Sequence, residues 1–362
     1  MAKKSVSHWD WIVKESEKGT EIWVGVDVHK SSYAVTALSG NGIKHSFTTP
    51  ANNEQLIKQF TDRGIQITQL AYESGPTGFG LYRASVAAGI KAMVAAASLT
   101  PQIPGKTAKT DKIDSAKIAE YLAKGHLRSI RVPSEAQEAA RSKSRRRSQI
   151  SQEIGKCKER IKSFLLVNSL SEPSGLKCWS QKSREELKEL EMIPALRFTM
   201  DSYLRELKFL EEEKALIEKD IKEQVLPEED VLQTVPGVGA VTSVIFRTEI
   251  YDPKRFETGE QVSSYIGLAP VINQSGAKAG YSRIIPRGQN KLRSVLVEAA
   301  WRLINTESWA SKFYCRVLKQ CGKTQKAIVA VARKLCVILW RLWLENRRYS
   351  SIVSNEKPLA QA

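Results

Sequence analysis

Two acidic residues lie where short β-rich runs of the sequence end, and both are candidates for metal binding. Asp27 lies within the apolar run WVGVDVHK, and Glu73 ends the run ITQLAYE just before the turn SGPTG. A buried carboxylate without a partner is costly, so Asp27 is expected to meet a cation, hydrogen-bond donors or an edge of the sheet. Gly25 lies on the same face of the strand as Asp27 and leaves room for a close approach.

A second pair of acids, Asp111 and Asp114, opens the helix-like run KTDKIDSAKIAEYL. Their spacing points both carboxylates the same way on a helix. Taken alone, they could serve as a helix cap and a favourable first-turn charge. With Asp27 and Glu73 they make a set of carboxylates whose mutual repulsion favours protonation or a divalent metal. Oxygen ligands suit Mg²⁺ or Mn²⁺, and such ions can assist phosphoryl transfer.

A serine–glycine pair, Ser275-Gly276, lies in a turn-rich segment after Gly267-Leu268-Ala269-Pro270. A serine hydroxyl is a weak nucleophile unless a base or a metal activates it, and this half of the chain has no histidine. The residue types alone therefore indicate a turn serine. The basic residues that follow it are expected to contact phosphates: Arg283, Arg287, Lys291 and Arg293.

Positive charge is in excess along the whole chain. Its 362 residues include 56 Lys and Arg against 39 Asp and Glu, a net charge of +17. A polyanion partner fits this excess, because binding releases counterions from phosphates. The run RSKSRRR, which contains Arg145, Arg146 and Arg147, could contact phosphates or form a solvated helix face.

The turn Pro-Gly-Val-Gly, with Gly237 and Gly239, separates two apolar runs in VLQTVPGVGAVTSVIF. This pattern predicts a helix–hairpin–helix, whose glycine turn exposes backbone N–H groups to a DNA phosphate. A plain packing corner between two helices is the alternative.

Several other classes of protein are disfavoured by the sequence. The most apolar stretch, residues 327–344, contains Arg333, Lys334 and Arg341, which indicates an amphipathic helix and not a membrane span. The N-terminus has no apolar signal core. Five cysteines without a C-x-x-C pair and four scattered histidines argue against a zinc site. We expect a protein of the reducing cytoplasm that does not bind membranes.

Three regions are expected to position these residues. Residues 20–132 predict an α/β layer fold with a mixed sheet, in which three antiparallel strands precede helix–strand units. Residues 133–226 predict two long helices with apolar residues at heptad spacing, either an antiparallel hairpin or a dimerising coiled coil. Residues 227–346 predict a mainly helical C-terminal domain.

Taken in order, the acidic motifs resemble a known family. VGVDVHK, AYESGPTG and KTDKIDSAKIAEYL look like the RuvC-like, ribonuclease-H-fold domain of the DEDD transposases, the insertion-sequence-110 family. Residues 267–293 are similar to the C-terminal transposase domain of that family, whose nucleophilic serine maps to Ser275. One departure, Ile285-Pro286-Arg287, stands where the family usually has a Ser/Thr-Lys pair and leaves the role of Arg287 open.

This resemblance implies a bacterial DNA recombinase. Asp27, Glu73, Asp111 and Asp114 would hold Mg²⁺ or Mn²⁺, and Ser275 would attack DNA to form a covalent phosphoserine. Donor and target DNA, a structured guide RNA from the element, and a homodimer that assembles to a tetramer would be the partners. Two alternatives stay open: a RuvC-like Holliday-junction resolvase or nuclease that uses water, with Ser275 structural, and a non-catalytic DNA-binding scaffold.

Overall fold

The computed structural model describes residues 8–97, 111–223, 230–271, 274–275, 278–279, 283–284 and 288–350. For residues 8, 111–112, 271, 274–275, 278–279 and 283–284 it describes the backbone only. The chain divides into two compact units, Met1–Val132 and Pro133–Ala362, and each is considered by itself.

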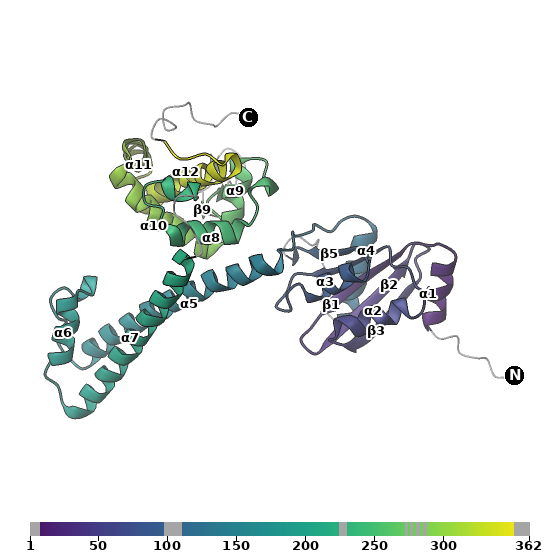
Figure 1. Ribbon diagram of the computed structural model, residues 1–362, viewed down its shortest axis with the longest axis horizontal. Coiled ribbons are helices and arrows are strands. Elements are labelled where there is room, and N and C mark those ends of the chain that lie inside the picture. The colour runs from purple at the N-terminus through teal and green to yellow at the C-terminus, as the bar shows by residue number, and fades with distance from the viewer. Residues whose placement is uncertain are drawn as a thin grey trace. The chain divides into compact units, whose positions relative to one another are not determined.

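The first unit is built on a mixed sheet of five strands in the order β3-β2-β1-β4-β5 (Figure 1). The strands are β1 (Ile22–Val28), β2 (Ser32–Ser39), β3 (Lys44–Pro50), β4 (Gln69–Glu73) and β5 (Ala92–Ala95). The first three pair antiparallel, whereas β4 lies parallel to β1 and β5 parallel to β4. The sequence prediction of a mixed α/β sheet is confirmed.

Alternation along β1 divides the core of this unit between two faces of the sheet. Val24 and Val26 belong to a buried cluster that includes Leu56 and Phe60 of α2 (Asn53–Thr61). Trp23, from the opposite face, packs on a second cluster that contains residues of α4 (Asp111–Ala123). The unit is completed by α1 (His8–Glu17) and α3 (Gly80–Ala87). The α4 helix therefore covers the face of the sheet on which Gly25 and Asp27 lie.

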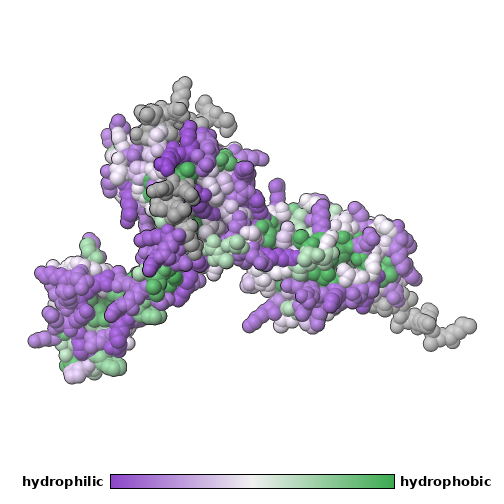
Figure 2. All heavy atoms as spheres, in the orientation of Figure 1, coloured by the Kyte–Doolittle hydropathy of each residue, from purple (hydrophilic) through white to green (hydrophobic). Residues whose placement is uncertain are grey.

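The second unit begins with a hairpin of two long antiparallel helices, α5 (Glu135–Val167) and α7 (Pro194–Glu223) (Figure 1). A 3-10 helix (Leu176–Cys178) and α6 (Gln181–Glu189) connect them. Several heptad positions are buried between the helices of one chain, namely Ile150, Ile154, Cys157, Ile161, Met200 and Leu207, and others such as Tyr203 and Leu210 are partly buried. Of the two arrangements that the sequence left open for this seam, the structure therefore has the hairpin. Figure 2 shows a largely hydrophilic outer surface over it.

The rest of this unit is mainly helical, as predicted. It contains α8 (Ala240–Ile250), α9 (Gly259–Ile266), α10 (Asn290–Thr306), α11 (Ser308–Cys321) and α12 (Thr324–Glu345). Short strands form two pairs, β6 (Pro270–Val271) with β9 (Arg283–Ile284), and β7 (Gln274–Ser275) with β8 (Lys278–Ala279). One expectation differs: the run before Pro236 is a short 3-10 helix, Val231–Thr234, because Asp230 caps it and Pro236 follows closely.

None of the helices within the described residues is long and apolar enough to cross a membrane. The apolar stretch near the C-terminus is α12, whose buried face includes Leu335 and Leu339.

Candidate functional site

The strand register places Asp27 and Glu73 at one edge of the sheet. In the parallel pairing of β1 with β4, Val26 lies opposite Tyr72, and the two acids are the next residues of their strands. The carboxyl ends of adjacent parallel strands meet at the same edge, with neighbouring strands about 4.8 Å apart. The Asp27 side chain is 24% exposed and Glu73 is half-buried, so solvent or a ligand can reach this edge.

Contacts of α4 show that its first turn lies at this same edge. Ser115 bonds Thr36 through their hydroxyls (2.9 Å), and Thr36 lies opposite Gly25. Further along the helix, Glu120 bonds Lys44, which lies at the level of Trp23 through Leu38. The helix therefore runs antiparallel to β1, so residues before Ser115 lie toward the Asp27 end of the strand.

Gly25 makes this close approach possible. A Cβ atom at this position would collide with the carbonyl oxygen of Ser115 and the backbone nitrogen of Ala119. The room that the sequence indicated beside Asp27 is therefore occupied by the backbone of α4. Only a residue without a side chain lets the helix lie so close to the sheet.

The remaining acids belong to the first turn of α4. Asp114 has a side chain 36% exposed, and its Oδ1 lies 3.5 Å from Lys117 Nζ. Asp111 is the first residue of the helix, and its side chain lies outside the described part. In the part of the chain that the structure describes, no three His, Cys, Asp or Glu side chains gather closely enough to hold a metal ion. The oxygen chemistry of the four acids nevertheless fits Mg²⁺ or Mn²⁺, and Asp27, Glu73 and the first turn of α4 lie at one sheet edge.

His29 is a neighbour of this edge that the sequence analysis missed. Its Nε2 lies 3.2 Å from Asp27 Oδ2, and its side chain is 47% exposed. The spacing of two residues along an extended chain was the available signal, because it puts both side chains on one face. A histidine that bonds a carboxylate in this way can fix the orientation of a metal ligand.

Ser275 lies on a small antiparallel hairpin, where it pairs with Lys278. The segment that carries it is closed at its base by two glycines, Gly267 and Gly288, with φ values of 83° and 120°. A Cβ on Gly288 would lie 2.8 Å from the Gly267 nitrogen, so the two backbones touch. Gly267 and Gly288 thus lie against each other at the two ends of the segment that carries Ser275.

Two of the basic residues singled out from RSKSRRR form intramolecular ion pairs. Arg145 Nε lies 3.2 Å from Glu249 Oε1, and an Arg147 terminal nitrogen lies 2.6 Å from Glu218 Oε1. Among the described residues no ion-pair partner is found for Arg146, which is exposed. The run therefore connects α5 to α7 and α8 through ion pairs, and Arg146 keeps a charge available to a ligand.

Of the basic residues predicted to contact phosphates near Ser275, two have side chains that the structure describes. Lys291 Nζ lies 3.5 Å from the Arg145 carbonyl oxygen, and Arg293 donates to the Gly267 carbonyl oxygen at 3.1 Å. Arg293 therefore stabilises the backbone at Gly267, where the segment that carries Ser275 begins. The side chains of Arg283 and Arg287 lie outside the described residues.

The glycine turn before α8 has a packing role, which is the alternative that the sequence pattern left open. Gly237 has a φ of 84°, and a Cβ there would lie 2.9 Å from the Ala299 carbonyl oxygen of α10. Gly239 is exposed, caps the start of α8 and would meet nothing within 4 Å. Close packing against α10 therefore explains why residue 237 is a glycine. At Gly239, the space beside the N-terminus of α8 is unoccupied by the described residues.

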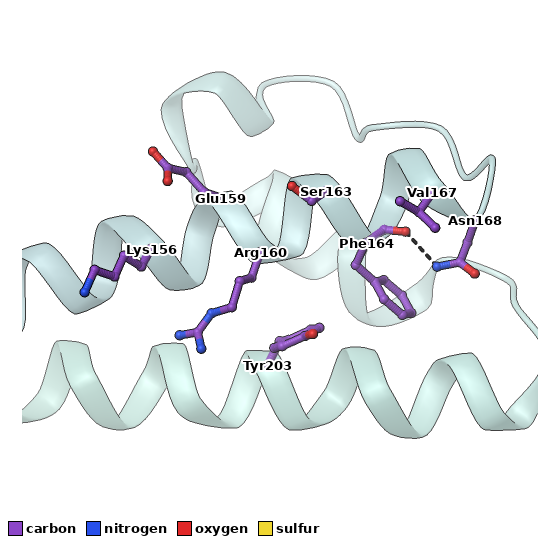
Figure 3. Close-up of a pocket in the computed structure, with 8 residues that line it drawn as sticks. All are labelled: Lys156, Glu159, Arg160, Ser163, Phe164, Val167, Asn168 and Tyr203. Carbon is purple, nitrogen blue, oxygen red and sulfur yellow. Dashed lines mark hydrogen bonds between the residues drawn. The ribbon is translucent and has the colours of Figure 1, made fainter.

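An open groove of about 610 Å³ lies along the helical hairpin, and none of the predicted site residues lines it. Arg160 and Phe164 of α5 point toward Tyr203 of α7 in this groove (Figure 3). Arg160 pairs with Glu206 at 2.7 Å, and Lys156 pairs with Glu153 at 2.9 Å. Since its cations are neutralised in this way, the groove offers no concentrated charge.

Two family models match this chain one after the other, and the first extends from the first unit into α5 of the second. Residues 24–168 match the DEDD transposase model of IS110 elements. Residues 229–315 match the model described as transposase IS116/IS110/IS902 family. A putative transposase, y4qE of Sinorhizobium fredii, is 28% identical over 91% of this chain and 90% of its own length.

Other relatives agree with these matches. The transposase for insertion sequence element IS1111A of Coxiella burnetii is 22% identical over 90% of each chain. A pilin gene-inverting protein of Moraxella bovis is 34% identical over 121 residues, 33% of this chain and 38% of its own. These matches define a transposase, an enzyme of DNA phosphoryl transfer. Within that class, the chain belongs to the IS110/IS116/IS902 family of insertion-sequence transposases.

Proposed function

We propose that this transposase cuts and rejoins DNA through a covalent phosphoserine at Ser275, with Mg²⁺ or Mn²⁺ held by Asp27, Glu73, Asp111 and Asp114. The observation that carries the metal site is the meeting of Asp27, Glu73 and the first turn of α4 at one sheet edge. When bound there, a divalent ion would supply stabilisation of the charge on the attacked phosphate.

The chemistry at Ser275 is an exchange of phosphoesters. As the bond from Oγ to phosphorus forms, the serine hydroxyl gives up its proton, the bond from phosphorus to a deoxyribose oxygen breaks, and that oxygen takes up a proton and leaves as a hydroxyl. A hydroxyl of a second DNA end reverses the exchange and releases the serine. Each step replaces one phosphoester by another, so the energy of the bond is kept and no nucleotide hydrolysis is required.

Several features support DNA cutting and rejoining as the reaction. One relative is named a pilin gene-inverting protein, and inverting a gene requires that DNA be cut and rejoined. The net charge of +17 fits a large polyanionic partner. We extend the proposal to a structured RNA guide encoded by the element, to a homodimer that assembles to a tetramer on nucleic acid, and to action in the bacterial cytoplasm.

The metal site is tested by replacing its acids one at a time. Asp27→Ala and Glu73→Ala should each lower the yield of DNA–protein adduct on a denaturing gel by a factor of at least about 100. DNA binding should stay close to wild type. The matched control is Asp62→Ala, an exposed acid at the end of α2 in the same unit. A folded Asp27→Ala protein that forms the adduct at the wild-type rate would remove the carboxylates from the mechanism.

A further inference from the structure

Arg255 is held in a cage of three aromatic rings. Its Cζ lies 4.5 Å from the centre of the Tyr251 ring, 4.9 Å from that of Phe256 and 4.6 Å from that of Tyr265. One guanidinium nitrogen also donates to the Ile250 carbonyl oxygen at 3.3 Å. Ring contacts of this kind fix the position of a guanidinium and leave its charge in place.

The backbone that carries Arg255 is fixed as well. It ends a 3-10 helix, Pro253–Arg255, which Asp252 caps through the Lys254 N–H. The indole nitrogen of Trp340 on α12 donates to the Pro253 carbonyl oxygen at 2.8 Å. The guanidinium is therefore preorganised by its rings and by its main chain.

Neighbouring arginines differ from Arg255 in having acidic partners. Arg141 also lies over the Tyr251 ring, and it pairs with Glu249 at 3.4 Å. Arg247 lies over the Trp343 ring and pairs with Asp230 at 2.7 Å. For Arg255, no ion pair with any carboxylate of the described residues is found, and its side chain is half-buried. Its positive charge is thus held rigidly and is not neutralised by these residues.

The cage lies at the base of the segment that carries Ser275. Tyr265, one wall of the cage, accepts a hydrogen bond from Gln289 Nε2 at 3.4 Å. Tyr265 lies two residues before Gly267 and Gln289 directly follows Gly288, the two glycines that close the segment. The charge of Arg255 is therefore positioned beside the two chain ends from which the serine segment extends.

We propose that Arg255 is a phosphate-binding residue that contacts a nucleic-acid backbone at the base of the Ser275 segment. A planar guanidinium suits a phosphate because it can donate two parallel hydrogen bonds. Immobilising it beforehand reduces the side-chain entropy lost on binding. The proposal rests on the proposed function in one respect, that this segment carries the nucleophile.

Binding measured without cleavage tests the proposal. Fluorescence anisotropy of a labelled DNA duplex, and separately of a labelled RNA hairpin, is recorded over a range of KCl concentrations without divalent ions. For Arg255→Gln, the slope of log affinity against log salt should become shallower by about 0.9 for duplex DNA, the value of one lost phosphate contact. Arg255→Lys keeps the charge and should retain the wild-type slope.

The matched control is Arg63→Gln. Arg63 also lies 4.5 Å from an aromatic ring centre, that of Trp9, but in the other unit. Its slope should equal the wild-type value. A shallower Arg255→Gln slope with DNA assigns the contact to DNA, and one with the RNA hairpin alone assigns it to RNA.

Unchanged slopes with both nucleic acids, together with a lower melting temperature for Arg255→Gln, would show a purely structural cage and overturn the proposal. An equal slope change in Arg63→Gln would overturn it too, because the effect would then be one of total charge. Neither result depends on which group cuts DNA, so failure here is separable from failure of the serine mechanism.

Discussion

Asp230 is a buried carboxylate that organises the start of the C-terminal helices. It is 4% exposed, and it accepts hydrogen bonds from Ser243, from Arg247 at 2.7 Å and from the Leu232 N–H at 3.1 Å. Burial by itself would raise the pKa of Asp230, but the bonds from Ser243 and Arg247 outweigh it and hold the pKa below its ordinary value of 3.8. The ionised Asp230 carboxylate is therefore more stable in the folded protein than in the unfolded chain.

This depressed pKa predicts how stability changes with pH. The contribution of Asp230 is fully present above its unfolded pKa and is lost as pH falls through the lower folded pKa. Asp230→Asn should lower the free energy of unfolding at neutral pH by roughly 2 kcal/mol, because charged hydrogen bonds are lost. Urea unfolding at several pH values measures this. If the free energy of unfolding of Asp230→Asn falls as steeply as that of wild type below about pH 4, Asp230 is not the source of this loss of stability.

Residue types and local spacing reveal only part of a site of this kind. Asp27 and Glu73 could be selected because strand alternation and strand ends are local properties. The same strand alternation could have identified His29, two residues after Asp27. The partners of Arg145 and Asp230 were not, because Glu249 lies 104 residues from Arg145, and Arg247 joins Asp230 only once α8 has folded. Such pairings depend on tertiary packing, which periodicity does not encode.

At the scale of elements, the helical hairpin shows what heptad spacing can and cannot indicate. The spacing identified the seam between α5 and α7, and the choice between one chain and two required the structure. Ion pairs on the flanks of the seam match the antiparallel register: Lys143 with Asp220 at 2.7 Å and Arg160 with Glu206 at 2.7 Å.

Two positions on α7 separate the seam from the outer face of the hairpin. Leu207 is 3% exposed and packs in the seam, whereas Phe209 is 59% exposed. Leu207→Glu should lower the free energy of unfolding by about 3 kcal/mol or more, because it removes a packed side chain and buries a charge. Phe209→Glu is the control and should melt close to wild type. Equal melting temperatures for both variants would contradict burial of Leu207 within the hairpin.

Glycines at two element junctions illustrate the same limit of sequence reasoning. Gly25 was expected to leave room beside Asp27, and the structure shows that the backbone of α4 takes this room. Gly237 packs against α10, and the contact of its backbone with a phosphate stays a prediction. Both glycines permit a close approach, and the sequence could not indicate what approaches.

At the scale of the whole molecule, the acidic site and the serine belong to different units. Asp27, Glu73, Asp111 and Asp114 are in Met1–Val132, and Ser275 is in Pro133–Ala362. The two family models match in the same order along the chain. The proposed reaction therefore depends on residues from both units, and loss of either set should stop it.

The most direct test of this account is the fate of the covalent adduct when Ser275 is replaced. Ser275→Ala removes a single oxygen atom, so folding and DNA binding should match wild type. If Ser275 is the nucleophile, the adduct on a denaturing gel and all strand exchange vanish together, because no other group stores the bond. Ser282→Ala, seven residues along, is the control and should leave both intact. If Ser275→Ala protein still cuts DNA and releases free 5′-phosphate ends, water is the nucleophile and the serine mechanism is wrong.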